Sequence, residues 1–382
     1  MKIFIFICGE GLGHTSRCTA LGQELLSAGH EIYFGAYGYS KEFIERKGYR
    51  TLEIPPEIKL VGDSGSLDLK KSITATLKNG NIFGIFKVLN LLKETKPDIV
   101  VSDSYFTGIV GSKAKKIPVY FIVNQSNMED FFKNGGVPLR TIGGLIKRIY
   151  SWVFRRVDRI IIPDFPMPYT VCRLNLVFEN EVSRNIFFSG PLVQKKYNDV
   201  KVATLQKPHV LSLIGGFGYR KPIFKKIIEI ANLDRSINYT LLSGPNLDPE
   251  VFSDLPENVN IEHFIDDQFP YIKASELVIA PGGHSTMMEA LTFGVPVLSF
   301  PDMNHNEQES NASVVDSEGY GRCLDYNTPP EKVLESIREL LEDKKIHQTV
   351  ENMKKLSEEL NAASSIRKLL ESNNSTSKKR YE

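Results

Sequence analysis

The sequence is poor in cysteine and holds no long apolar run. Its four cysteines, Cys8, Cys18, Cys172 and Cys323, are scattered over 382 residues without a C-x-x-C spacing. This argues against a zinc site and a disulfide framework and favours a reducing compartment. No apolar run reaches the about 18 residues of a membrane-spanning helix, and the apolar opening KIFIFIC is too short for a signal peptide. We therefore expect a cytoplasmic protein.

An excess of charge is also absent. The net charge is only +1, which argues against nucleic acid as a partner. The charge is unevenly distributed, since residues 1–193 hold 25 Lys and Arg against 18 Asp and Glu, a net +7, whereas the remainder holds 22 against 28, a net −6. The first half is therefore basic and the second half acidic.

The length predicts two domains, because 382 residues exceed the usual size of one hydrophobic core. Gly190-Pro191 and the polar, lysine-containing stretch after them are typical of a hinge. We predict a first domain at residues 1–193, a linker at 194–207 and a second domain at 208–370. The tail at 371–382 has almost no apolar side chains and is expected to be disordered.

Both halves begin with a strand, a glycine turn and a helix. In the first half, a strand at Lys2–Cys8 precedes GEGLGH and a helix at Thr15–Ala28. In the second, a strand at Val210–Ile214 precedes GGFG and a helix at Lys221–Ala231. This pattern predicts an α/β fold of two Rossmann-like, doubly wound domains that face each other across a cleft. A dehydrogenase is disfavoured, because the second strand ends in FGAYG without the acidic residue of a dinucleotide fingerprint.

Residues 277–312 carry the most informative pattern of the chain. An apolar strand leads through Pro281-Gly282-Gly283 into a helix for which Ser285 or Thr286 is the expected N-cap. The first-turn N–H groups of such a helix suit a phosphate, and Glu289, one turn further on, could accept two hydrogen bonds from a ribose. The loop 301–309 then gathers carboxylate, amide and imidazole groups, which is typical of a site for sugar hydroxyls.

The pattern GGHST-x-x-EAL-x-x-GVP, followed by P-x(5)-EQ-x-x-NA, resembles the donor signature of two-domain GT-B glycosyltransferases. It is most similar to the MurG-type N-acetylglucosaminyltransferases, their archaeal relatives and the UDP-glycosyltransferases, although plant-type members of the last group have histidine in place of Pro281. The resemblance implies a GT-B fold whose last helix crosses back to the first domain, and a UDP-sugar donor. It assigns donor binding to Gly215, Gly216, Gly218, Arg220, Phe264, Ile265, Gly282, Gly283, His284, Ser285, Thr286, Glu289, Glu307 and Gln308. No Asp-x-Asp motif is present, so we expect neither a metal nor a cofactor.

The first half supplies candidates for the acceptor side. His14 stands where a glycine loop becomes a helix, so its imidazole could act as general base toward a hydroxyl, and Asp103, at the end of a strand, could orient it. The alternatives are a structural His14 and an Asp103 that caps the next helix. The GEGLGH loop resembles the GGTGGH loop of the MurG family, which implies acceptor contacts by Gly11 and Gly13. The segment Asn124-Gln125-Ser126-Asn127 matches the place of the family's HEQN segment, which implies contacts of Gln125 and Asn127 with the acceptor or a pyrophosphate. The identity of the acceptor stays open, because Val123-Asn124 replaces the family's His-Glu pair.

Residues 140–159 combine six basic side chains with Trp152 and several aliphatic residues. Such a segment could lie in an anionic membrane interface, and the alternative is a core-packing helix with a solvated basic face. We predict an inverting glycosyltransferase that moves a hexose or N-acetylhexosamine from a UDP-sugar to a hydroxyl acceptor that is a lipid or lipid-linked. The alternatives are a UDP-N-acetylglucosamine 2-epimerase-like enzyme and a nucleotide-sugar-binding protein without turnover.

Overall fold

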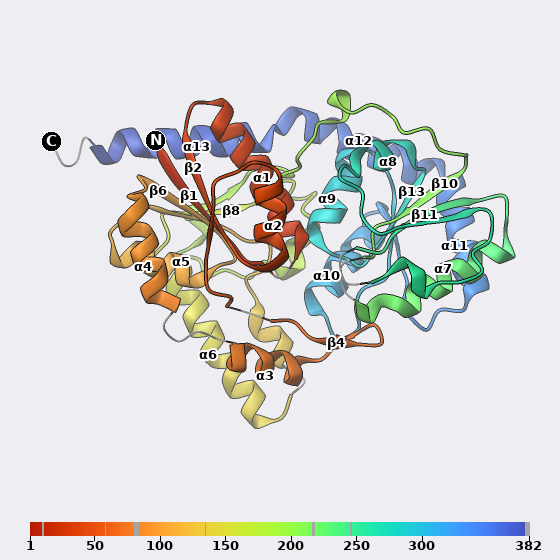
Figure 1. Ribbon diagram of the computed structural model, residues 1–382, viewed down its shortest axis with the longest axis horizontal. Coiled ribbons are helices and arrows are strands. Elements are labelled where there is room, and N and C mark those ends of the chain that lie inside the picture. Colours follow the sequence, from red (N-terminus) through yellow and green to blue (C-terminus); the bar gives the residue numbers. More distant parts are fainter. Residues whose placement is uncertain are drawn as a thin grey trace.

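The computed structural model describes residues 1–9, 11–57, 59–79, 84–133, 135–215, 218–244 and 247–378. It contains two parallel sheets, one in each half of the chain, so the predicted α/β architecture is confirmed (Figure 1). The predicted donor residue Gly216 lies outside the described residues.

The first sheet has seven parallel strands with β1 near its centre. In sheet order they are β3 (Thr51–Glu53), β2 (Glu31–Ala36), β1 (Lys2–Ile7), β6 (Ile99–Asp103), β7 (Val119–Ile122), β8 (Arg159–Ile162) and β9 (Ile186–Phe188). The helices of this half are α1 (Leu12–Ser27), α2 (Gly38–Arg46), α3 (Leu69–Asn79), α4 (Gly84–Thr95), α5 (Phe106–Ala114) and α6 (Val137–Phe154). The strand order reverses between β1 and β6, which is where a doubly wound sheet opens a crevice at the carboxyl ends of its strands.

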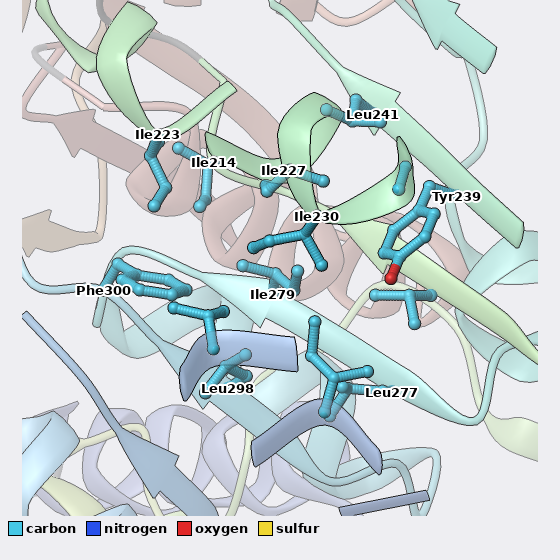
Figure 2. Packing of buried hydrophobic residues seen from close by; sticks show 14 of the residues in the cluster. Ile214, Ile223, Ile227, Ile230, Tyr239, Leu241, Leu277, Ile279, Leu298 and Phe300 are labelled. Atoms are coloured by element: carbon cyan, nitrogen blue, oxygen red, sulfur yellow. The ribbon is translucent and has the colours of Figure 1, made fainter. Parts of the chain in front are cut away.

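The second sheet has six parallel strands and the same kind of reversal, between β10 and β13. In sheet order they are β12 (Val259–Glu262), β11 (Asn238–Leu242), β10 (His209–Ser212), β13 (Leu277–Ala280), β14 (Val297–Ser299) and β15 (Gly321–Cys323). The helices are α7 (Lys221–Leu233), α8 (Phe269–Ala274), α9 (His284–Thr292), α10 (Asn306–Ser317), α11 (Pro330–Glu342) and α12 (Lys344–Leu360). Figure 2 shows how Ile223, Ile227 and Ile230 of α7 pack on the strands, against Leu277 and Ile279. Apolar side chains at helical spacing on α7 thus cover a sheet face that is apolar in turn.

The last helix crosses back to the first half, as predicted. Helix α13 (Ala362–Lys378) follows α12 and returns over the first sheet (Figure 1), where Ile366 and Leu370 are buried beside Leu21 and Leu25 of α1. The tail is expected to be disordered from residue 371, whereas α13 extends to Lys378. A helix that is already nucleated gains one backbone hydrogen bond per added residue, which favours its extension beyond Leu370. Residues 379–382 lie outside the described part of the chain.

The two halves exchange segments. Phe165 and Val171, which follow β8, are fully buried in the core of the second half against Met287 and Leu291 of α9. A two-stranded hairpin of β4 (Gly62–Asp63) and β5 (Ser66–Leu67) also reaches across, since Met303 N donates to Gly65 O at 2.9 Å. The halves are therefore joined by buried packing and by backbone hydrogen bonds as well as by the stretch 194–207.

Candidate active site

A cavity of about 660 Å³ lies between the two sheets, where the glycine turns after β1, β10 and β13 meet. Both halves contribute to its wall, because the carboxyl ends of both sets of parallel strands point toward the cleft. The predicted residues that line it are Gly11, Gly13, His14, Gly215, Arg220, Phe264, Ile265, Gly283, His284, Ser285, Thr286, Glu289, Glu307 and Gln308. The predicted acceptor and donor loops are thus brought together in one space.

The predicted residues absent from the cavity wall are Asp103, Gln125, Asn127, Gly218 and Gly282. Asp103 is fully buried behind His14. Gln125 and Asn127 were expected to contact the acceptor, but both are buried, and Asn127 Nδ2 donates to Asp130 Oδ2 at 2.7 Å. The side chain that lines the cavity here is Asn124, because after β7 the chain turns this residue toward the cleft.

His14 and Asp103 form a hydrogen-bonded pair, as the sequence predicted. His14 lies in the first turn of α1, which begins at Leu12 rather than at the expected Thr15. Its Nδ1 lies 2.8 Å from Asp103 Oδ1. An ionised carboxylate only accepts hydrogen bonds, so Nδ1 carries the proton and Nε2 of the neutral ring keeps its lone pair. The ring is partly exposed to the cavity, which leaves Nε2 as the basic atom of this pair.

Arg17 was not predicted, yet it completes this pair. It is buried, and its Nε and Nη2 each lie 2.5 Å from one oxygen of Asp103. Nη2 also lies 2.9 Å from His14 Nδ1, but because that nitrogen is protonated, Nη2 donates to the carboxylate. Burial raises the pKa of the Asp103 carboxyl, but the charge of Arg17 and the hydrogen bonds from Arg17 and His14 outweigh it and hold this pKa well below its usual range. Arg17 follows His14 by three residues on one helix face, which is the signal that could have identified it.

Glu289 of α9 is buried at the interface of the two halves. Its Oε1 accepts a hydrogen bond from Ser16 Oγ of the first half at 2.9 Å, and its Oε2 accepts from Gln268 Nε2 at 2.6 Å. Burial raises the pKa of this carboxyl to about 7, against a smaller lowering by Ser16. Glu289 therefore changes its charge near neutral pH in a site that could bind hydroxyl donors.

The loop after β14 divides its polar side chains between the cavity and the core. Glu307 Oε1 accepts from Asn124 Nδ2 at 2.7 Å. Gln308 also borders the cavity, but its Oε1 accepts from Asp302 N and its Nε2 donates to Asp302 Oδ2. Arg220 likewise borders the cavity and is held by Asp302, with Nη2 2.5 Å from Oδ2. Gln308 and Arg220 thus build a buried cluster around Asp302, and Glu307 is the carboxylate presented to the cavity.

The start of α9 is built differently from the prediction. Its N-cap is Gly283 and not Ser285 or Thr286, and no side chain caps it. Ser285 instead faces the first half, where a Cβ added at Gly13 would lie 2.7 Å from Ser285 Oγ. Glycine at position 13 therefore permits the close approach of the two loops. The first-turn N–H groups of α9 lie at the cavity without a capping side chain, which suits a phosphate.

His284, the first residue of α9, is buried and pairs with a residue that is not among the predicted site residues. Its Nε2 lies 3.0 Å from Oδ2 of Asp164, in the loop after β8. Burial raises the pKa of the Asp164 carboxyl, but the charge of His284 and hydrogen bonds from His284 and Cys172 N outweigh it and lower this pKa. The Cys172 thiol completes a group whose candidate ligand atoms lie within 4.8 Å of one another. Because these hydrogen bonds already account for the geometry, we interpret the group as one that orients His284.

Exposed basic and apolar side chains lie together on helix α6, whose place in the fold is labelled in Figure 1. Its large apolar side chains Val137, Leu145, Ile149 and Trp152 are exposed, by 78%, 59%, 47% and 39% respectively. Basic side chains lie among them, and the guanidinium carbon of Arg156 stands 4.4 Å from the centre of the Trp152 ring. Over the described residues, no helix combines the length and the hydropathy needed to cross a bilayer.

Comparisons with known proteins agree with this arrangement. The family model described as the glycosyltransferase family 28 C-terminal domain matches residues 221–369. An "Uncharacterized glycosyltransferase" of Methanosarcina acetivorans is 62% identical over 371 residues, which cover 97% of this chain and 98% of that protein. The UDP-N-acetylglucosamine–N-acetylmuramyl-(pentapeptide) pyrophosphoryl-undecaprenol N-acetylglucosamine transferase of Rickettsia conorii is 24% identical, with 91% and 93% covered.

Among solved structures, the calicheamicin glycosyltransferase CalG4 is similar in fold, with a TM-score of 0.72, 17% identity and 97% of each chain covered. The spinosyn rhamnosyltransferase SpnG in complex with thymidine diphosphate has a TM-score of 0.69 at 15% identity, with 97% of this chain and 100% of that chain covered. At these identities the likeness concerns the fold.

Proposed function

The chain belongs to the glycosyltransferases, with the predicted GT-B fold and a family 28 carboxyl-terminal domain, and we propose that it transfers a sugar from a UDP-sugar to a hydroxyl acceptor with inversion. The observation that carries this proposal is that His14, paired with Asp103, shares one cavity with Glu289, Glu307 and the start of α9. A donor and an acceptor bound together in this cavity would therefore contact both the proposed base and the proposed nucleotide-sugar site.

In the proposed reaction, His14 Nε2 takes the proton of the acceptor hydroxyl as its oxygen attacks the anomeric carbon. The new bond forms on the face opposite the diphosphate, so the bond from this carbon to the diphosphate oxygen breaks with inversion. Asp103 remains ionised and stabilises the imidazolium that forms. The N–H groups at the start of α9, with Ser285 and Thr286, stabilise the negative charge that develops on the leaving diphosphate.

The second half would hold the UDP. Phe264 and Ile265 line the cavity beside Gly244, where the family resemblance puts the uracil, and Glu289 is suited to accept hydrogen bonds from the ribose. Support for UDP comes from the relative of Rickettsia conorii, which by its name uses UDP-N-acetylglucosamine. Glu307 would then face the transferred sugar, a hexose or an N-acetylhexosamine.

A lipid or lipid-linked acceptor is proposed from the exposed apolar and basic face of α6. Aliphatic and Trp side chains at a membrane surface bury apolar area, while Lys and Arg attract anionic lipid. The same relative uses a pyrophosphoryl-undecaprenol acceptor by its name, which supports an acceptor presented at a membrane surface.

The substitution His14→Ala tests the proposed base. We expect turnover to fall by about two to four orders of magnitude, because no other group takes the proton in the transition state. UDP affinity should stay within about twofold, since His14 lies on the acceptor side. Release of UDP from a panel of UDP-sugars with lipid extracts as acceptors gives turnover, and calorimetry gives affinity.

His347→Ala, in α12, is the matched control for loss of an imidazole. If UDP affinity collapses in His14→Ala while turnover of bound substrate persists, the base assignment is wrong. Epimerisation of a UDP-sugar without acceptor by the unmodified chain would point instead to the 2-epimerase-like alternative.

A further inference from the structure

Asn124 of the first half lies against Glu307 of the second half, at the wall of the cavity. Asn124 Nδ2 donates to Glu307 Oε1 at 2.7 Å, and Asn124 is 6% exposed. Glu307 belongs to the first turn of α10, whereas Asn124 follows β7. A carboxylate of the proposed donor loop is therefore held by the opposite half of the molecule.

The orientation of the Asn124 amide is determined by its other partner. Arg17 Nη1 donates to Asn124 Oδ1 at 3.2 Å, and a guanidinium has no acceptor. The oxygen of Asn124 must therefore face Arg17 and its NH₂ group must face Glu307. Arg17 itself is fixed by its two hydrogen bonds to Asp103, so the amide has no equivalent flipped state.

Glu307 is held from the first half at its backbone too. Its carbonyl oxygen accepts a hydrogen bond from Asn175 Nδ2 at 3.1 Å. With Oε1 engaged by Asn124, Oε2 is the carboxylate oxygen left to accept a hydrogen bond from a ligand in the cavity. A hydrogen-bond acceptor of this kind binds a hydroxyl group of a ligand and discriminates against a ligand that lacks this group.

We propose that Asn124 is a positioning residue of the donor-sugar site, which holds Glu307 so that Oε2 receives a hydrogen bond from a hydroxyl of the transferred sugar. This inference rests on the proposed function. Through Arg17 and Asp103 the same chain of hydrogen bonds reaches His14, so the carboxylate that binds the sugar and the base that activates the acceptor are held in one network across the cleft.

Reversing the polarity of the hydrogen bond tests this proposal. In Glu307→Gln, the side-chain oxygen can satisfy Asn124 only by turning its NH₂ group to the sugar. In Asn124→Asp, the new carboxylate still accepts from Arg17 but opposes Glu307. In the double variant, Gln at position 307 donates to Asp at position 124 and keeps its oxygen for the sugar.

The measured quantity is the ratio of the affinity for a UDP-sugar to the affinity for UDP, by calorimetry. UDP-glucose and UDP-N-acetylglucosamine are the probes, and the one that the unmodified chain binds more tightly is used. Each single substitution should lower this ratio about tenfold, the scale of one hydrogen bond to a charged group. The double variant should recover to within about threefold of the unmodified chain. Asn232→Asp, exposed on α7, is the control for the added charge and should leave the ratio unchanged.

An unchanged ratio in Asn124→Asp, or a double variant no better than the product of its two single losses, overturns the proposal. If the unmodified chain binds neither UDP nor either UDP-sugar, the proposed function fails instead. The contact between Asn124 and Glu307 is then tested by the melting temperatures of the two single variants and the double variant. Recovery in the double variant supports the positioning contact, and additive losses overturn it.

Discussion

The Glu289 carboxyl group has different surroundings in the protein without nucleotide and in the proposed complex with nucleotide. Without nucleotide it is buried and hydrogen-bonded to Ser16 and Gln268, and burial favours its neutral form. A ribose would present two hydroxyl donors, which bind better to a carboxylate. Ionised Glu289, which is predicted to bind the nucleotide, therefore lowers the free energy of unfolding of the protein without nucleotide.

This conflict predicts a dependence of stability on pH. Between the usual carboxyl pKa of 4.5 and the folded pKa of about 7, the folded chain keeps a proton that the unfolded chain loses. The folded state binds more protons in this window, so the free energy of unfolding falls as pH rises. Glu289→Gln imitates the neutral carboxyl and should be more stable than the unmodified chain by on the order of 2–3 kcal/mol at pH 8, with little difference near pH 4.

Urea unfolding at both pH values measures the difference. Glu335→Gln, exposed on α11, is the matched control and should show no trend. A difference between Glu289→Gln and the unmodified chain that does not change with pH would contradict a buried carboxyl that titrates near neutrality.

At the scale of single elements, the sequence could predict those contacts between site residues that follow from the order of the strands and the period of the helices. His14 lies in the helix that follows β1, and Asp103 is the last residue of β6. Because β1 and β6 pair in parallel, a doubly wound sheet brings both residues to the same edge. The sequence could not decide which residue after β7 faces the cleft, since a shift of one position exchanges Asn124 for Gln125. It also could not find Asp164 beside His284, because that contact depends on how the two halves dock.

Helix α6 packs Val153 and Phe154 into the core, and the following prediction concerns its exposed face. In the variant Leu145→Asp with Ile149→Asp, two exposed apolar side chains become acidic, so the fold should persist while binding to vesicles that contain anionic phosphatidylglycerol falls at least about tenfold. Vesicle sedimentation measures this, and added salt should weaken the binding of the unmodified chain.

The matched control carries the same charge change on the second half. Leu233→Asp with Val251→Asp alters two side chains that are 49% and 46% exposed and should bind vesicles like the unmodified chain. Equal loss in both variants would show that overall charge, and not the face of α6, governs the binding.

At the scale of the whole molecule, each half completes the core of the other. Phe165 and Val171 from the first half are buried in the second, and α13 from the end of the chain is buried against α1. Packing shared in this way couples the two halves energetically. We therefore expect one cooperative unfolding transition, although the chain has two sheets and two predicted domains.

The substitution Ile366→Ala tests this coupling across the molecule. Ile366 is fully buried against the first half, so its truncation should cost about 2–5 kcal/mol and should speed amide exchange in α1 and β2 as well as in α13. Lys368→Ala, on the exposed side of the same helix, should leave exchange unchanged. Faster exchange confined to α13 would mean that this helix is only attached to the first half, whereas faster exchange in α1 would show that the end of the chain stabilises the helix that carries His14.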